Sequence, residues 1–218
     1  MLEVKLTSVS VVVVSDGNNA RILNPDFLER NEIVPKGWKT QNVIVTPPIA
    51  AVQYENGVSI TVEDAKLTFS ANPAVFDWAT GLPRIVSTYL DVLPHVSYRA
   101  VGLNYTFSSD NPTGKQAEEQ LIRNTLKDGP WLKFGQGITG VVLELQYRGS
   151  QPFLVLRLGV RETIKPEGNV LEGYIFTANL HHDFNADQRI ERREYIYLLG
   201  SRQTDVLNLI RLLPLTPT

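Results

Sequence analysis

Alternation between bulky and small residues marks residues 96–107 as a long strand near the centre of a predicted sheet. Val101, Leu103, Tyr105 and Phe107 occupy odd positions, and the even positions between them hold smaller residues. Successive side chains of a strand point to opposite faces, so one face is bulky and apolar and the other is small. This pattern predicts a core on the bulky face and a helix packed closely against the small face.

The same alternation predicts a group of strands in the first half of the chain. The apolar positions change phase near Thr7, which indicates a β-bulge. Asn56-Gly57 separates two apolar runs, and this dipeptide favours the type I′ turn of a β-hairpin. The strands predicted here are residues 2–14, 49–55, 58–62 and 65–70.

Residues 20–42 have no regular period, and Asn24-Pro25, Pro35 and Gly37 interrupt them. They predict a loop with about one helical turn. Pro47-Pro48 offers no backbone donor, so we expect strand pairing to begin only after it.

Helical spacing of apolar residues predicts helices at 83–93, 113–127 and 204–213. Pro83 would lie in the first turn of its helix, and Ser201 would cap the last helix. The middle helix begins with a capping box at residues 113–116. Further strands are predicted at 138–147, 153–161, 171–182 and 193–199.

Runs of strands with helices between them predict an α+β fold in one domain, residues 1–218. We expect a mixed, mostly antiparallel sheet of about eight strands that carries about three helices. A strand group followed by a helix occurs in residues 43–107 and again in 113–213, which is compatible with a loose internal duplication.

Composition narrows the classes of function. The chain has 218 residues, a net charge of −2 and no cysteine. The charge gives no field that would attract nucleic acid or an anionic membrane, and the missing thiols exclude disulfides and cysteine nucleophiles. Met1 to Leu6 does not resemble a signal peptide, so we expect a cytoplasmic protein. Phosphate-binding glycine loops and dinucleotide fingerprints are missing, so we predict no cofactor.

A strand carrying Gln53, then Trp78 before a helix, then the strand Arg99-Ala100-Val101-Gly102-Leu103-Asn104-Tyr105 form an ordered pattern. This pattern resembles that of a family of sporadically distributed, uncharacterised bacterial proteins. The resemblance implies an α+β fold and a cytoplasmic bacterial protein. The family has no established activity, so the resemblance assigns no functional residue.

Residues 183–194 match the spacing of an EF-hand calcium loop. The oxygen ligands would come from Asp183, Asn185, Asp187 and Glu194, because calcium prefers such hard donors. Gln188 stands where the loop normally needs glycine, and strands are predicted on both sides. A polar hairpin loop is therefore the favoured interpretation, with calcium binding as the alternative.

The three histidines offer a second metal hypothesis. His181 and His182 are adjacent, and His95 is the third. Neighbouring strand residues point to opposite faces, so the pair cannot chelate one ion unless the strand bulges. A zinc-dependent hydrolase would need one of them to meet His95 and Asp183 in space. The plainer interpretation is one half-buried and one exposed histidine at a strand end.

Three arginines share strand faces with apolar residues. Arg99 lies in the predicted central strand, and Arg157 and Arg161 share a face of a later one. They predict either the exposed face of an amphipathic strand or guanidinium groups that line a concave sheet and grip an anionic or peptide ligand.

We expect a non-catalytic module that binds another protein or itself by its sheet face or an edge strand. A second hypothesis is small-molecule binding in a cavity between the sheet and the helix at 83–93. The candidate ligand-binding residues there are Tyr98, Arg99, Asn104, Trp78 and Trp131. The third hypothesis is the metal-dependent hydrolase.

Overall fold

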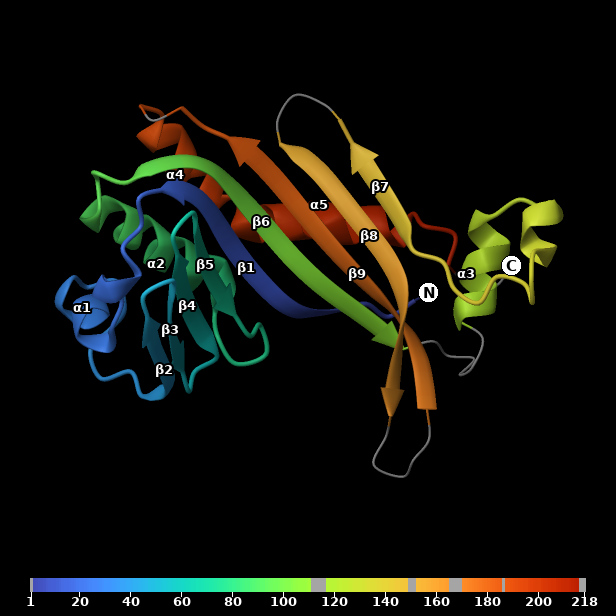
Figure 1. Cartoon of the computed structure of the whole chain (residues 1–218), viewed down its shortest axis with the longest axis horizontal. Helices are drawn as coiled ribbons and strands as arrows, with labels where there is room; N and C mark the ends of the chain where they lie inside the picture. Colours follow the sequence, from blue (N-terminus) through green and yellow to red (C-terminus); the bar gives the residue numbers. More distant parts are fainter. Residues whose placement is uncertain (1, 111–116, 149–151, 165–169, 186, 216–218) are drawn as a thin grey trace.

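One sheet of nine strands dominates the computed structural model, which describes residues 2–110, 117–148, 152–164, 170–185 and 187–215 (Figure 1). The strand order is β2-β3-β4-β5-β1-β6-β9-β8-β7. All pairs in this described sheet are antiparallel, so the expected mixture of directions is wrong. The strands are β1 (Lys5–Asp16), β2 (Thr40–Thr46), β3 (Ile49–Tyr54), β4 (Val58–Glu63), β5 (Lys66–Ala71), β6 (Ser97–Asp110), β7 (Leu143–Tyr147), β8 (Phe153–Ile164) and β9 (Val170–Asp183).

Five α-helices and two short 3-10 helices accompany the sheet in the described residues, where about three helices were expected. The α+β class is therefore confirmed, while both element counts were too low. The helices are α1 (Pro25–Arg30), α2 (Trp78–Val92), α3 (Ala117–Thr125), α4 (Arg189–Tyr197) and α5 (Leu199–Arg211), with η1 (Ala20–Ile22) and η2 (Pro130–Lys133).

The long strands β1 and β6 hold the middle of the sheet. Their register shifts between Leu6 and Ser8, which confirms the bulge predicted near Thr7. Val11 pairs with Leu103, and these two side chains belong to the buried face. The central strand predicted at 96–107 is thus present as β6.

The core lies between the bulky face of the sheet and helices α2, α4 and α5. The Tyr105 hydroxyl donates to the Leu199 carbonyl of α5 over 2.6 Å, and the rings of Phe69 and Tyr89 meet edge to face. In Figure 1, α2 and α5 lie behind the strands, and the opposite face of β1, β6 and β9 is turned to the viewer. The expectation that a helix would pack on the small face of β6 is wrong, because the apolar area that a helix must bury is on the other face.

The first half of the chain contains a strand that the sequence pattern did not predict. β2 precedes Pro47-Pro48 and pairs with β3, so pairing does not begin only after the prolines. The predicted loop at 20–42 contains η1, α1 and the start of β2 rather than a single helical turn.

The hairpin at Asn56-Gly57 is confirmed, but its turn type is not. Gly57 has a φ of 82° and its N–H donates to the Tyr54 carbonyl, whereas Asn56 is outside the positive-φ region. A type I′ turn needs both central residues there. Here the Asn56 side chain instead accepts a hydrogen bond from the Val58 N–H.

Three helix boundaries differ from the predictions. α2 begins at Trp78, so Pro83 lies inside the helix and not in its first turn. Residues 193–199 were predicted as a strand, but residues 193–197 belong to α4 and Leu199 begins α5. Ser201 lies within α5, where its hydroxyl donates to the Leu198 carbonyl, so it is not the N-cap. The capping box at 113–116 lies outside the described residues.

Within the described chain, every helix is too short or too polar to cross a membrane.

Candidate functional site

β2 is an edge strand whose outer side faces solvent. All seven of its residues are exposed, and its ladder partner is β3 alone. Val43, Ile44 and Val45 expose between 42% and 48% of their surface. The strand contains no charged residue and no proline. Lysine, proline and bulges are the usual devices that protect such an edge. The register of β2 is irregular between Thr40 and Asn42, and the regular part of the strand, residues 42–46, contains neither lysine nor proline. The outer backbone groups of residues 42–46 are therefore open to a further strand.

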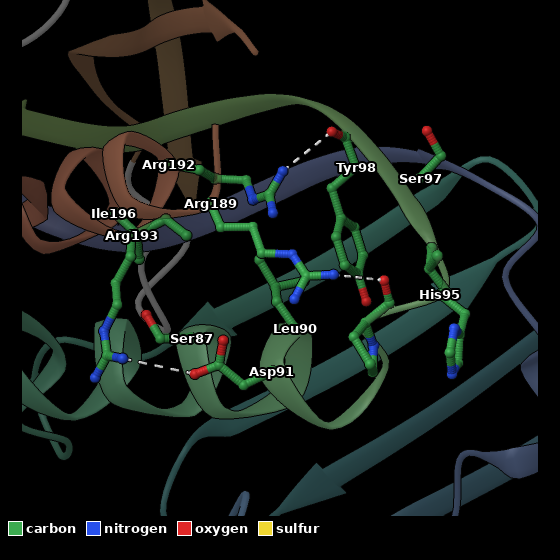
Figure 2. Close-up of a pocket in the computed structure, with 12 residues that line it drawn as sticks. Ser87, Leu90, Asp91, His95, Ser97, Tyr98, Arg189, Arg192, Arg193 and Ile196 are labelled. Carbon is green, nitrogen blue, oxygen red and sulfur yellow. Dashed lines mark hydrogen bonds and ion pairs between the residues drawn. The ribbon is translucent and has the colours of Figure 1, made fainter. Parts of the chain in front are cut away.

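A second feature is a cavity of about 250 Å³ between α2, α4 and the start of β6 (Figure 2). Helix α4 places three arginines along it, and α2 contributes Ser87, Leu90 and Asp91. The connection that leads into β6 supplies Pro94, His95 and Val96, and Ser97 is the first residue of β6.

Polar contacts fix the arginines of this cavity. Arg192 donates to the Tyr98 carbonyl over 3.2 Å, and its guanidinium carbon lies 5.1 Å from the centre of the Tyr98 ring. Arg189 donates to the Pro94 carbonyl over 3.0 Å. Arg193 lies 3.7 Å from the Asp91 carboxylate. Figure 2 shows the three side chains reaching from α4 toward α2 and β6.

The candidate residues Tyr98 and Arg99 are neighbours with different surroundings. Tyr98 is buried at the cavity, where its hydroxyl donates to the Leu93 carbonyl and burial raises its pKa. Arg99 is exposed and pairs with Asp16 over 2.6 Å. Its partner is therefore a carboxylate of β1, and it does not line the cavity between α2 and α4.

Asn104 lies on the uncovered face of the sheet. Its side-chain oxygen accepts a hydrogen bond from the Asn179 amide over 2.6 Å. Both residues line a broad depression on this face, together with Arg157, Thr106 and Thr177. Of the three arginines expected to line a concave sheet, Arg157 alone lines this depression.

Arg157 already has a carboxylate partner, because it contacts Glu144 over 2.5 Å. Hydrogen bonds from Gln146 and Arg157 hold the pKa of the Glu144 carboxyl below its ordinary value. Arg161 is half-buried, and its Nε has no partner among the described residues. It lies opposite Gly173, which pairs with Asp110, so it is far along the sheet from Arg99.

The two tryptophans do not join Tyr98 in a ligand site. Trp78 is half-buried at the first turn of α2 and packs against the core. Trp131 lies in η2 with 55% of its surface exposed. Neither lines the cavity between α2 and α4.

The residues of the predicted calcium loop lie at the junction of β9 and α4. Asp183 ends β9 and contacts His181, while the Asn185 N–H donates to the Gln188 side chain. Residues 189–194 belong to α4, so the segment is neither a closed twelve-residue loop nor a loop between two strands. Asp187 precedes this helix, and Glu194 lies inside it.

The histidines lie in different surroundings. His181 contacts Asp183 over 2.9 Å, and the His182 ring stacks on Phe184 at 4.2 Å. Burial lowers the pKa of His182. Both are half-buried, so the expectation that one is exposed is wrong. His95 is at the cavity between α2 and α4. Over the described ranges, no three His, Asp or Glu side chains are grouped to hold a metal ion.

Sequence reasoning missed Ser87 and the three arginines of α4. The signal was present, because Arg189, Arg192 and Arg193 have the spacing of one helical face. Reading residues 193–199 as a strand concealed it. The cavity between a helix and the sheet was expected near 83–93, but Tyr98 is the one proposed ligand residue that lines it.

No protein-family model matches the chain, and a search of curated proteins found no significant match.

Proposed function

We propose that this protein is a binding module that accepts an extended segment of another protein at the outer side of β2. One observation carries the proposal: a seven-residue edge strand that is exposed throughout, uncharged and free of proline. Such an edge presents a row of backbone donors and acceptors, and an added strand gains its affinity from those groups. From the sequence we expected binding of a protein by a sheet face or an edge strand, without a choice between the two.

The chemistry of β2 narrows the class of partner. The strand has no charge to attract or repel a charged segment, and apolar side chains are present on both of its faces, since neighbours alternate. A neutral segment rich in β-branched residues is therefore the best complement.

The length of β2 favours a peptide-like segment over a second folded copy. Seven residues form an edge of about 23 Å. Stable interfaces between globular proteins bury about 1,200–2,000 Å², which one short edge does not provide.

Selection from a displayed library of seven-residue peptides tests the proposal. We expect neutral peptides with alternating β-branched residues, bound to the intact protein with micromolar affinity in fluorescence anisotropy. Ile44→Lys places a charge in the middle of the edge and should weaken the binding of these peptides at least about tenfold. Because Ile44 is exposed, the melting temperature should not change.

Gln146→Lys is the matched control, because Gln146 is an exposed residue of β7, the strand at the other edge of the sheet. This variant should bind the peptides like the unchanged protein. Equal binding by Ile44→Lys would contradict the proposal. A dimer in sedimentation analysis that Ile44→Lys dissociates would assign the edge to a second copy instead.

A further inference from the structure

The cavity between α2, α4 and β6 contains a buried cation without an anionic partner. Arg192 exposes 5% of its surface. No carboxylate of the described residues lies within 4.0 Å of it. The acceptor that it reaches is the Tyr98 carbonyl, although a guanidinium carries five N–H donors. A buried charge of this kind is costly unless an opposite charge completes it.

Ser87 adds a second incomplete polar group at the same place. It exposes 4% of its surface, and its hydroxyl has no hydrogen-bond partner in the described structure. Buried hydroxyl groups are normally paired. The Arg192 guanidinium and the Ser87 hydroxyl line one cavity, although they come from different helices, α4 and α2.

The charges of the lining favour an anion with more than one negative charge. Arg189, Arg192 and Arg193 are accompanied by a single carboxylate, Asp91, which leaves an excess of two positive charges. Asp91 lies on the Arg193 side of the cavity. Arg189 and Arg192 are therefore free to face a ligand with their remaining donors.

The rest of the lining is mixed, with His95 and Ser97 beside apolar residues. Leu90, Val96 and Ile196 contribute to the wall, and Tyr98 adds an aromatic ring. The volume of about 250 Å³ holds a small molecule but no large one. An anionic group at the arginines would thus leave room for a short apolar remainder.

From these observations we infer that the cavity binds the phosphoryl group of a small phosphate monoester. Arg192 and Arg189 contact the phosphoryl oxygens, and the Ser87 hydroxyl donates to a third oxygen. A phosphate monoester carries close to two negative charges at neutral pH and three acceptor oxygens, whereas a carboxylate has one charge and two oxygens. The site is separate from the β2 edge and does not depend on the function proposed above.

Calorimetry with three probes tests the assignment on the intact protein. The probes are phenyl phosphate, inorganic phosphate and benzoate. We expect phenyl phosphate to bind with a dissociation constant below about 1 mM and benzoate to bind at least about tenfold more weakly. Tighter binding of phenyl phosphate than of inorganic phosphate supports a monoester, and the reverse order assigns the site to free phosphate and overturns the monoester.

Variants separate the cavity from general attraction to positive charge. Arg192→Gln should weaken the binding of phenyl phosphate at least about tenfold, and Ser87→Ala should weaken it several-fold. Arg30→Gln should leave the binding unchanged. Arg30 is an exposed arginine of α1 and serves as the control. Arg189→Gln removes an exposed side chain and covers the case in which Arg192→Gln fails to fold.

No heat from any probe with the folded, unchanged protein would overturn the inference. Benzoate binding as tightly as phenyl phosphate would also overturn the phosphoryl assignment. Equal losses of affinity in Arg192→Gln and Arg30→Gln would show that the probe binds through general surface charge and not in the cavity, which would overturn the inference.

Discussion

Two buried tyrosines show how the contribution of a hydroxyl group to stability depends on its hydrogen-bond partner. Tyr105 of β6 donates to the Leu199 carbonyl over 2.6 Å and so ties the central strand to the start of α5. Tyr54 of β3 is equally buried, but its hydroxyl has no partner among the described residues. Burial and an acidic neighbour, Glu29, raise the pKa of Tyr54 to about 12, so this hydroxyl stays neutral near pH 7.

Removing each hydroxyl should therefore have opposite consequences. Tyr105→Phe loses a buried hydrogen bond, and we expect the free energy of unfolding to fall by about 1 kcal/mol. Tyr54→Phe removes an unpaired polar atom from the core, so stability should be unchanged or higher. Urea unfolding at pH 7 measures both. A larger loss in Tyr54→Phe than in Tyr105→Phe would contradict this assignment of partners.

For single residues, the sequence indicated whether a side chain would be buried or exposed better than it indicated which residue would be its partner. Arg99 was expected on an exposed strand face or at an anionic ligand, and it is exposed, but its carboxylate partner Asp16 depends on the pairing of β1 with β6. Arg192 and Ser87 are far apart in the chain, and nothing in their local sequence indicates that one cavity contains both.

In the turn of the β3–β4 hairpin, both the backbone conformation and the space around it favour glycine. Gly57 has a φ of 82°, a conformation that is costly for other residues. A Cβ at this position would lie 2.8 Å from Val75 and 2.9 Å from Asn72. Gly17 has a similar φ of 78°, but a Cβ there would meet no atom within 4 Å.

The two glycines separate backbone strain from crowding. Gly17→Ala should lower the free energy of unfolding by about 1 kcal/mol through its backbone alone. Gly57→Ala should cost more, by about a further 1 kcal/mol, because the Asn72 Cβ cannot move without its backbone. Thermal and urea unfolding of both variants measure the difference. Equal losses would show that the turn relaxes and that crowding is unimportant.

Elements with a clear period were predictable, and those stabilised by distant contacts were not. The strand pattern of β3, β4 and β5 was recognisable because one face of each is buried. β2 is exposed on both faces and so lacks the alternation that marks a strand. In α4, the aromatic and β-branched residues favoured a strand, but Tyr195 and Ile196 are buried, as is Leu199 of α5 three and four residues further on, which is helical spacing.

The whole molecule is a sheet with a buried middle and two different edges. β1 and β6 pair on both sides, and helices cover their bulky face. β7 carries Glu144, whose carboxylate contacts Arg157, whereas β2 has no charge at all. This contrast between the edges is the basis for placing the partner at β2. Strand order depends on pairings across the whole chain, so local alternation could not predict it.

The possibility of an internal duplication stays a prediction at this scale, as do the cytoplasmic location and the bacterial origin. The two halves contribute β2-β3-β4-β5 and β9-β8-β7 on opposite sides of β1 and β6. Each half carries helices, but their order along the chain differs, because α3 precedes the strands of its half.

Amide hydrogen exchange of β2 tests the central claim most directly, because it reports on the backbone groups that an added strand would use. The comparison is between the free protein and the protein saturated with a peptide from the library selection. We predict that the outward-facing β2 amides, which do not bond to β3, exchange rapidly in the free protein and slowly in the complex, while amides of β1 and β6 exchange slowly in both. Rapid exchange of β2 in a saturated complex, or slow exchange in the free protein at low concentration, would contradict the open edge.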